Sequence, residues 1–159
     1  MLTSHLKSND VAEYFINRAK KENSALTPKK LQKMLYYAQA WFLVFEDKKL
    51  FNEKIEAWLH GPAILSIYQK YKIFGFSPII KEVNQDILNK IPSSIEKFLS
   101  DIWKVYGKFD ADYLEILSHN EDPWRKARIN VGEFSASKNE ITDIAMKTFY
   151  KQLLNQNTK

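Results

Sequence analysis

Residues 27–45 read TPKKLQKMLYYAQAWFLVF and carry the clearest helical pattern in the chain. Thr27 is a residue type that caps helices, and Pro28 suits the first helical position because its missing N–H needs no partner there. Apolar side chains then recur at helical spacing, at Leu31, Met34, Leu35, Tyr37, Ala38, Trp41, Phe42, Val44 and Phe45. A helix that is apolar on several faces is enclosed by other elements, so we expect residues 27–46 to form a central buried helix.

Working outward, the flanking sequence predicts further helices joined by short connections. Ser8 or Asn9 can cap a helix over 8–22, and Asp110 and Asp122 are placed to cap two short helices, the second opening at Pro123. The remaining start and stop signals are Gly61-Pro62 and Gly75, Pro92 and Gly107, and a capping box of Ser137 and Glu140 before the last helix. Six or seven helices are expected in all.

A small β element should lie beside these helices. Residues 50–59 break the helical period, with polar side chains interleaved among apolar ones, and residues 76–83 look like a second extended piece that could pair with them. The predicted fold class is therefore mainly α (α+β), a compact single-domain helical bundle around 27–46. Residues 1–154 form the domain, and residues 155–159 are expected to fray.

Composition narrows the class of protein. The 159 residues contain no cysteine, which rules out disulfides, Cys-ligated zinc, iron–sulfur clusters and a Cys nucleophile. Residues 1–10 have no apolar run, and the longest one, residues 40–45, is far shorter than the ~20 residues that span a bilayer. These features predict a cytoplasmic protein with neither a secretory signal nor a membrane span.

The positive charge is one-sided. The net charge is +5, and residues 1–80 carry all of it, with 12 Lys and Arg against 7 Asp and Glu. Such a surplus permits an acidic partner, either nucleic acid or an acidic protein face. Only 3 of the 24 basic residues are Arg. Because reading of base edges favours the rigid fork of Arg, a nucleic-acid partner is the less favoured of the two.

Two groups of residues could carry chemistry. Lys29, Lys30 and Lys33 begin the central helix, where they either dock a phosphate or carboxylate at the helix N-terminus or form a solvated face. His119, Glu121 and Asp122 either serve acid–base catalysis or lie in a loop whose side chains cap the next helix.

Known catalytic and metal-binding patterns are missing from the sequence. A metal site would need His60 and His119 with Glu121 or Asp122, and nothing in the sequence brings these side chains together; the third histidine is His5. There is no glycine-rich phosphate loop and no zinc-protease motif. We therefore expect neither a cofactor nor a metal, and no catalytic residues.

Two sequence signatures occur in order along the chain. The first comprises LQKMLYYAQAW at 31–41, LFNE at 50–53 and IEAWLHGP at 55–62, and the second is LSHNEDPWRKAR at 117–128. Together they resemble the Panacea domain family over roughly residues 8–130. Two departures are His60, where an aromatic residue is more usual, and Ala63-Ile64, where two β-branched residues are more usual. Neither disturbs the Trp, Gly and Pro frame of the signatures.

The resemblance implies a proteic antitoxin that neutralises a cognate toxin, encoded by a neighbouring gene of a phage, prophage or toxin–antitoxin operon, by direct protein contact. It implies that the protein is not an enzyme. Alternatives are a nucleic-acid-binding module using the basic N-terminal half, a hydrolase or nuclease using His60, His119 and Glu121, and a general protein adaptor. The residue types at Trp58, Gly61, Pro62, Pro123 and Trp124 indicate scaffold. The expected partner contacts are Lys29, Lys30, Lys33, His119, Glu121 and Asp122.

Overall fold

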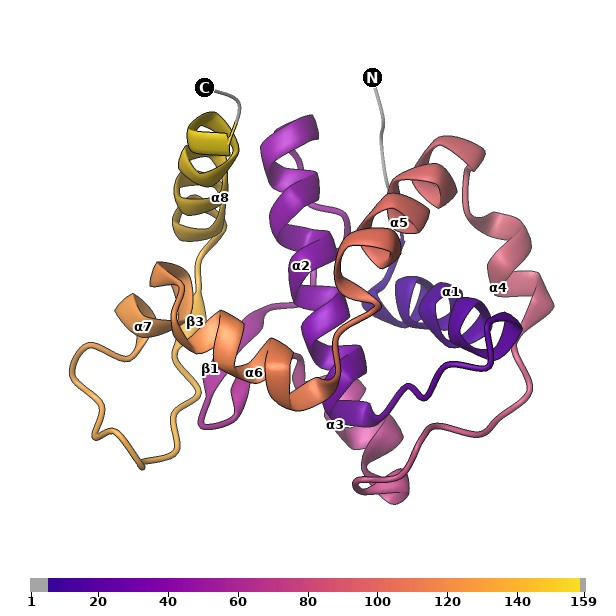
Figure 1. Cartoon of the computed structure of the whole chain (residues 1–159), viewed down its shortest axis with the longest axis horizontal. Coiled ribbons are helices and arrows are strands. Elements are labelled where there is room, and N and C mark those ends of the chain that lie inside the picture. The colour runs from indigo at the N-terminus through magenta and orange to yellow at the C-terminus, as the bar shows by residue number, and fades with distance from the viewer. Residues whose placement is uncertain (1–5, 158–159) are drawn as a thin grey trace.

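A computed structural model describes residues 6–157 as a helical domain with one small sheet (Figure 1). The mainly helical prediction is confirmed. Within the described range there are eight α-helices, one 3-10 helix and three strands. In chain order these are α1 (Ser8–Lys21), α2 (Pro28–Glu46), β1 (Ile55–Trp58), β2 (Gly61–Ala63), α3 (Leu65–Tyr71), η1 (Lys72–Phe74), α4 (Gln85–Lys90), α5 (Ser93–Tyr106), α6 (Ala111–His119), α7 (Asp122–Ala127), β3 (Glu140–Ile141) and α8 (Asp143–Asn157).

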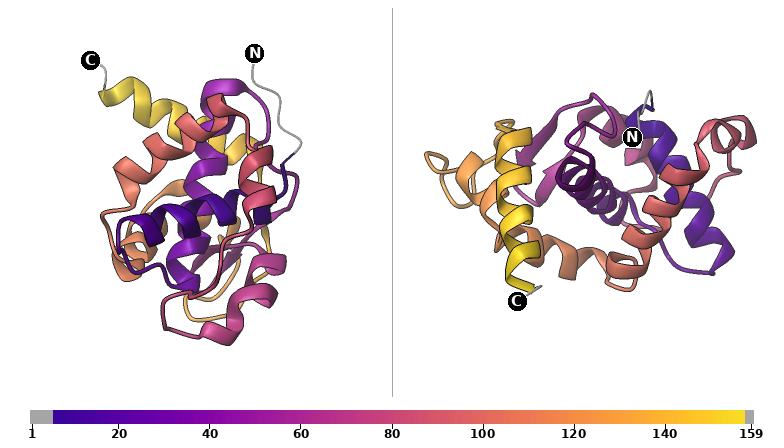
Figure 2. Two further views of the ribbon diagram at one scale, coloured as in Figure 1. Left: turned by 90° about the vertical axis from the view of Figure 1, so that its right-hand side faces the viewer. Right: turned by 90° about the horizontal axis from the view of Figure 1, so that it is seen from above.

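Helix α2 is the centre of the fold, as its sequence pattern predicts. Thr27 caps it by accepting a hydrogen bond from the Lys30 amide at 3.2 Å, and it ends at Asp47, which adopts a left-handed conformation. Every side chain from Lys30 to Ala40 is buried. Seen from above, α2 stands between α8 on one side and α1 and α5 on the other (Figure 2). Its broad apolar surface is therefore covered from several directions.

Two buried glutamines of α2 fasten the chain on either side of the sheet. Gln39 donates to the carbonyl of Phe51 at 2.7 Å and accepts from the amide of Leu50 at 2.7 Å. Gln32 makes the same pair of bonds with the backbone of Ile64, at 3.0 and 2.9 Å. Because a buried amide is costly unless its groups are paired, these side chains fix where the β element begins and ends relative to α2.

The sheet is antiparallel with strand order β2-β1-β3. Residues 55–58 form β1, within the predicted segment, but the prediction that 76–83 pairs with it is wrong. Residues 76–83 form no strand, and Ile79 instead donates a backbone hydrogen bond to Leu26 at 2.8 Å. The third strand is β3, in which Ile141 pairs with Ile55 and is only 1% exposed. Pairing of β3 with β1 therefore buries the Ile141 side chain, which adds apolar contacts to the core.

Two predicted helix caps near the chain ends are wrong. At α1 the preceding Lys7 takes the cap position, while the amide and hydroxyl of Ser8 both donate to Glu53. The Ser137 and Glu140 capping box does not form, because Glu140 belongs to β3. The hydroxyl of Thr142 accepts from the amide of Ala145 at 3.1 Å instead. At α1 a tertiary contact takes the Ser8 side chain, whereas at the last helix Glu140 pairs in the sheet and the Ser137 hydroxyl accepts from the nearby amide of Asn139 at 3.0 Å.

The cap predicted at Asp122 is also displaced. Helix α7 begins at Asp122 itself. Glu121 occupies the cap position, but its side chain accepts no hydrogen bond from the amides of the first turn of α7. Asp122 pairs instead with Arg125 at 3.2 Å and Lys126 at 3.6 Å. By contrast, the Asp110 cap of α6 is confirmed by its hydrogen bond from the amide of Tyr113 at 2.8 Å.

The C-terminal helix α8 continues to Asn157, into the segment expected to fray. Thr158, Lys159 and the first five residues, which include His5, lie outside the described residues. In the described part of the chain, no helix combines the length and apolar character needed to cross a membrane.

Candidate functional site

The Gly61-Pro62 turn is locked against α2. Gly61 has φ of +112°, a conformation that side chains with a Cβ rarely adopt. A Cβ at this position would lie 2.5 Å from Cε of Lys33 and 3.3 Å from Oγ of Ser118. Lys33 Nζ donates to the carbonyl of Pro62 at 3.2 Å. The backbone conformation therefore requires glycine, and a Cβ would in addition have to displace the end of the Lys33 side chain.

Lys33 is an ammonium group held inside the protein. Its side chain is 2% exposed, and burial lowers its pKa from 10.5 to about 7. The nearby carboxylate of Glu115 opposes this shift, while the charge of Lys29 adds to it. Burial thus favours the uncharged amine of Lys33 far more than water does.

Trp124 joins α7 to the hairpin. Its indole N–H donates to the carbonyl of Trp58 at 2.8 Å, and its ring stacks on His119 with centroids 3.8 Å apart. The guanidinium of Arg128 lies 5.0 Å from the Trp124 ring centroid and donates to the carbonyl of Ala57 at 2.9 Å. Arg128 also donates to the carbonyls of Gly132 and Ser135, so it shapes the loop that follows α7. All of these contacts are internal.

The three lysines at the start of α2 do not form one exposed basic cluster. Lys30 is 6% exposed, and its ammonium donates to the carbonyl of Gly107 at 2.6 Å and lies 5.2 Å from the Trp103 ring centroid. Burial lowers its pKa. The expectation of solvated side chains is therefore wrong for Lys30 and Lys33. Their long stems run along the core, and their head groups satisfy backbone carbonyls.

Lys29 alone of these three lysines is partly accessible, and it joins a surface ion-pair cluster. It contacts Asp112 at 2.9 Å and also Glu115, which in turn lies 3.2 Å from Nδ1 of His60. Burial alone would lower the pKa of Lys29, but the hydrogen bonds to the two carboxylates raise it. The cluster ties the start of α2 to α6 and to the hairpin.

The sequence-adjacent trio His119, Glu121 and Asp122 is divided among three environments. His119 is half-buried against Trp124, and its Nε2 finds no hydrogen-bond partner among the described residues. Burial lowers its pKa. Glu121 is buried in the core, whereas Asp122 forms its ion pairs at the surface. The geometry therefore assembles no acid–base pair from this trio.

Glu121 belongs to a buried tyrosine network. The hydroxyls of Tyr37 and Tyr150 donate to its Oε1 at 2.7 and 2.9 Å, and the hydroxyls of Tyr36 and Tyr150 lie 2.9 Å apart. Burial raises the pKa of Glu121, although the two hydrogen bonds work against this shift. The network links α2, α8 and the start of α7. It leaves Glu121 unavailable to the surface histidine His60.

Metal binding is not supported by the arrangement either. Within residues 6–157, no three His, Asp or Glu side chains come together in a way that could hold a metal ion.

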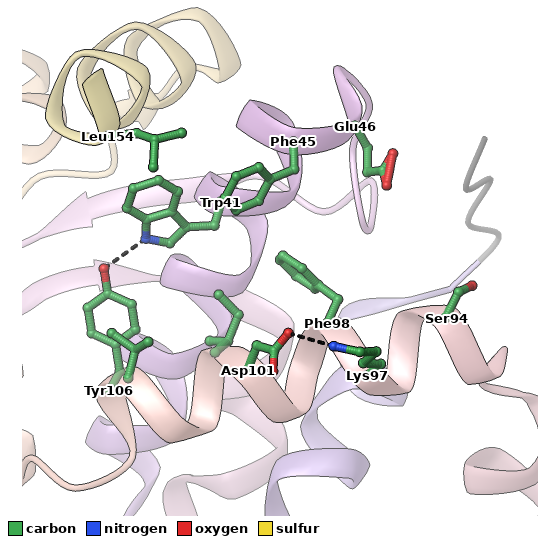
Figure 3. Close-up of a pocket in the computed structure, with 11 residues that line it drawn as sticks. Trp41, Phe45, Glu46, Ser94, Lys97, Phe98, Asp101, Tyr106 and Leu154 are labelled. Carbon is green, nitrogen blue, oxygen red and sulfur yellow. Dashed lines mark hydrogen bonds and ion pairs between the residues drawn. The ribbon is translucent and has the colours of Figure 1, made fainter. Parts of the chain in front are cut away.

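A second region, at the opposite end of α2, is open and apolar. We call it the α2–α5–α8 groove, a cavity of about 500 Å³ (Figure 3). Its apolar walls are Trp41, Phe45, Phe98, Ile102, Val105, Tyr106 and Leu154, and its margin carries Glu46, Ser94, Lys97 and Asp101. Phe45 is 57% exposed and Val105 is 53% exposed. Their sequence spacing is that of core residues, so no sequence signal distinguishes this surface from the core.

Comparison with known proteins gives two matches. The sequence model of the family described as "Antitoxin SocA-like, Panacea domain" matches residues 31–125. Antitoxin SocA of Caulobacter vibrioides (strain NA1000 / CB15N) is 27% identical over 124 residues, covering 72% of this chain and 66% of that protein. The chain thus spans about two thirds of the length of this relative. No solved structure matches the chain.

Proposed function

This chain belongs to the SocA-like antitoxin family of Panacea domains, as its two signatures predict, and we propose that it is a proteic antitoxin that neutralises a cognate toxin by direct protein–protein binding. The observation that carries the proposal is the family match over residues 31–125, which include most of α2, the β1–β2 hairpin, α6 and most of α7. The toxin would be encoded by a neighbouring gene in a phage, prophage or toxin–antitoxin operon.

Binding, and not catalysis, fits the way polar groups are used in this protein. Lys30, Lys33 and Glu121 are each occupied by internal partners. A buried polar group that is already paired is available neither to a substrate nor to a partner. This distribution supports a non-enzymatic role in which the polar interior holds the fold and the surface binds the toxin.

The proposed toxin contacts follow from accessibility. Of the six candidate contact residues, Lys29 and Asp122 keep side-chain exposures of 26% and 38%, and His119 is half-buried. We keep these three as proposed contacts. Lys30, Lys33 and Glu121 would influence the toxin only through the scaffold, because their head groups face the interior.

The test is co-expression with the product of the neighbouring gene. The antitoxin should restore growth that the toxin alone arrests, and the two proteins should copurify as a complex. A stable interface of this kind buries roughly 1,600 Å² in total. The proposal would be contradicted if both proteins are expressed and folded but the chain neither restores growth nor forms a complex with the toxin.

A nucleic-acid-binding role is the alternative from another class. Burial removes the ammonium groups of Lys30 and Lys33 from the basic N-terminal half, which weakens the charge argument for it. Binding to phosphates would show an affinity that falls steeply with salt concentration. Salt-independent or absent binding of a DNA duplex at low salt would remove this alternative, whereas a general adaptor role would share the protein-binding physics of the antitoxin.

A further inference from the structure

The α2–α5–α8 groove is long enough to bind a helix along α5. Its α5 wall is made by Ser94, Lys97, Phe98, Asp101, Ile102 and Val105. These positions repeat at intervals of three and four, so one face of α5 runs along the whole groove. At 1.5 Å per residue this wall is roughly 16 Å long, which accommodates about three turns of a partner helix.

The floor of the groove is apolar and already fixed. The Trp41 ring stacks on Phe45 with centroids 5.7 Å apart, and its indole N–H donates to the hydroxyl of Tyr106 at 2.8 Å (Figure 3). Because the indole N–H of Trp41 is already paired with Tyr106, an apolar side chain that covers it leaves no buried donor without a hydrogen-bond partner. A preformed surface also saves the ordering cost that a mobile one would impose on binding.

The margin of the groove differs in charge from the rest of the molecule. It carries two carboxylates, Glu46 and Asp101, and one ammonium, Lys97, which pairs with Asp101 at 3.5 Å. The local balance is negative although the chain as a whole carries +5. Basic side chains on an incoming helix would therefore meet complementary charge here, and a second copy of this chain would be repelled by its like net charge.

We propose that the α2–α5–α8 groove binds an amphipathic helix of the partner protein, with an apolar face seated on Trp41, Phe45 and Phe98 and basic residues flanking that face. This proposal rests on the proposed function, since it assigns the chemistry of the toxin segment that is bound. Helices that dock in this way present anchors at i, i+3, i+4 and i+7.

The direct test needs no toxin. The probe is a fluorescently labelled peptide of about 18 residues, with Leu on one face of the helix and Lys on the other. It is titrated with the full chain, and binding is followed by fluorescence anisotropy. Matched peptides carry Glu in place of Lys, or the same Leu and Lys in scrambled order. We expect the Leu–Lys peptide to bind at least about tenfold more tightly than either, despite the positive net charge of the protein. Equal or tighter binding of the Leu–Glu or scrambled peptide would overturn the proposal, as would absence of binding.

Variants locate the binding surface. The double variant Phe45→Ser, Val105→Ser should lower the affinity for the Leu–Lys peptide at least about tenfold, because truncating central apolar anchors removes most of the binding energy. The matched control is Ile73→Ser with Phe76→Ser, which removes side chains that are 84% and 96% exposed on η1 and the loop after it. An equal loss in the control pair would overturn the proposal. Self-association of the wild type that disappears in the groove variant would assign the surface to a second copy instead.

Growth of cells that express the toxin separates this proposal from the antitoxin function. If the wild type restores growth and the groove variant, with unchanged thermal unfolding, does not, both proposals are supported. If both restore growth equally, the groove proposal fails and the antitoxin function stands. If the wild type does not restore growth, the antitoxin function fails, and the peptide titration still decides the chemistry of the groove.

Discussion

The two ends of α2 differ in what they bury and what they expose. In its first half, the polar side chains Lys30, Gln32 and Lys33 are turned inward, and each is bonded to a backbone group. In its last turns, Trp41 and Phe45 line an open apolar groove. Most signature residues of α2 thus build the closed end, and the signature reaches the open end only at Trp41. The open end is exposed because α5 and α8 do not cover that part of α2. One helix supplies both the rigid frame and the surface that we propose for binding.

The largest expected effect is at Trp124, which closes the frame. Trp124→Ala should lower the free energy of unfolding by ~3–4 kcal/mol, because it removes the stack on His119 and the bond to Trp58. Urea denaturation measures the change, and Trp124→Phe, which keeps a stacking ring, should cost ~1 kcal/mol. A loss below ~1 kcal/mol for the alanine variant would make Trp124 a surface residue and weaken the contrast between the two ends.

The Gly61 turn gives the next largest effect. Gly61→Ala should cost ~2–3 kcal/mol, because a Cβ there is both strained at φ of +112° and pressed against Lys33. Gly75→Ala is the matched control. Gly75 also has a positive φ, of 57°, with ψ of −122°, but nothing lies within 4 Å of its Cβ position, so only backbone strain of ~1–2 kcal/mol is expected. Equal costs in urea denaturation would show that the close approach to Lys33 contributes nothing.

The buried amine of Lys33 predicts a pH dependence. Its folded-state pKa of about 7 lies below the unfolded value of 10.5, so the unfolded chain binds more protons between these pH values. Stability should therefore rise with pH in this window, by up to ~1.4 kcal/mol per pH unit, and fall as pH returns toward 7. Unfolding of Lys33→Met should lack this slope. Parallel stability curves for the two proteins would mean that the ammonium is hydrated.

Glu121 predicts a smaller effect of opposite sign. Since burial raises its pKa above 4.5, its contribution to stability is fully present below that pH and is lost as pH rises through the folded-state pKa. Relative to Glu121→Gln, the wild type should lose ~1 kcal/mol between pH 4.5 and neutrality. The difference between the two unfolding curves isolates Glu121 from other carboxylates. A wild type that gains stability over the variant across this range would contradict the prediction.

The smallest expected effect on stability is at the open end. Phe45→Ser should change the free energy of unfolding by no more than ~0.5 kcal/mol, because the ring is 57% exposed. Thermal unfolding at matched concentration checks this. A loss of several kcal/mol would instead make Phe45 part of the core and erase the difference between the two ends of α2.

Much of the helical frame could be predicted from the sequence because its signals are local. The Thr27-Pro28 start, the Asp110 cap and the Pro92 and Gly107 boundaries of α5 each depend on a few neighbouring residues. Strand β3 could not be predicted, since two residues carry no period and their partner, β1, is far away along the chain.

The candidate site was harder to predict, because it depends on burial and not on residue type. A lysine whose stem reaches a carbonyl in the core, as at Lys30 and Lys33, has the same sequence signal as a solvated lysine. Phe45 and Phe98 have the spacing of core residues, and only the positions of α5 and α8 decide that they line a groove.

The position of α8 also bears on how the protein is made. Helix α8 packs on α2, its Tyr150 closes the buried hydroxyl network, and β3 immediately before it completes the sheet. During synthesis these residues leave the ribosome after α1 to α7. Until they do, one side of the central helix α2 stays uncovered, and apolar surface exposed on a nascent chain is what chaperones bind. The domain can close its core only after β3 and α8 have been synthesised.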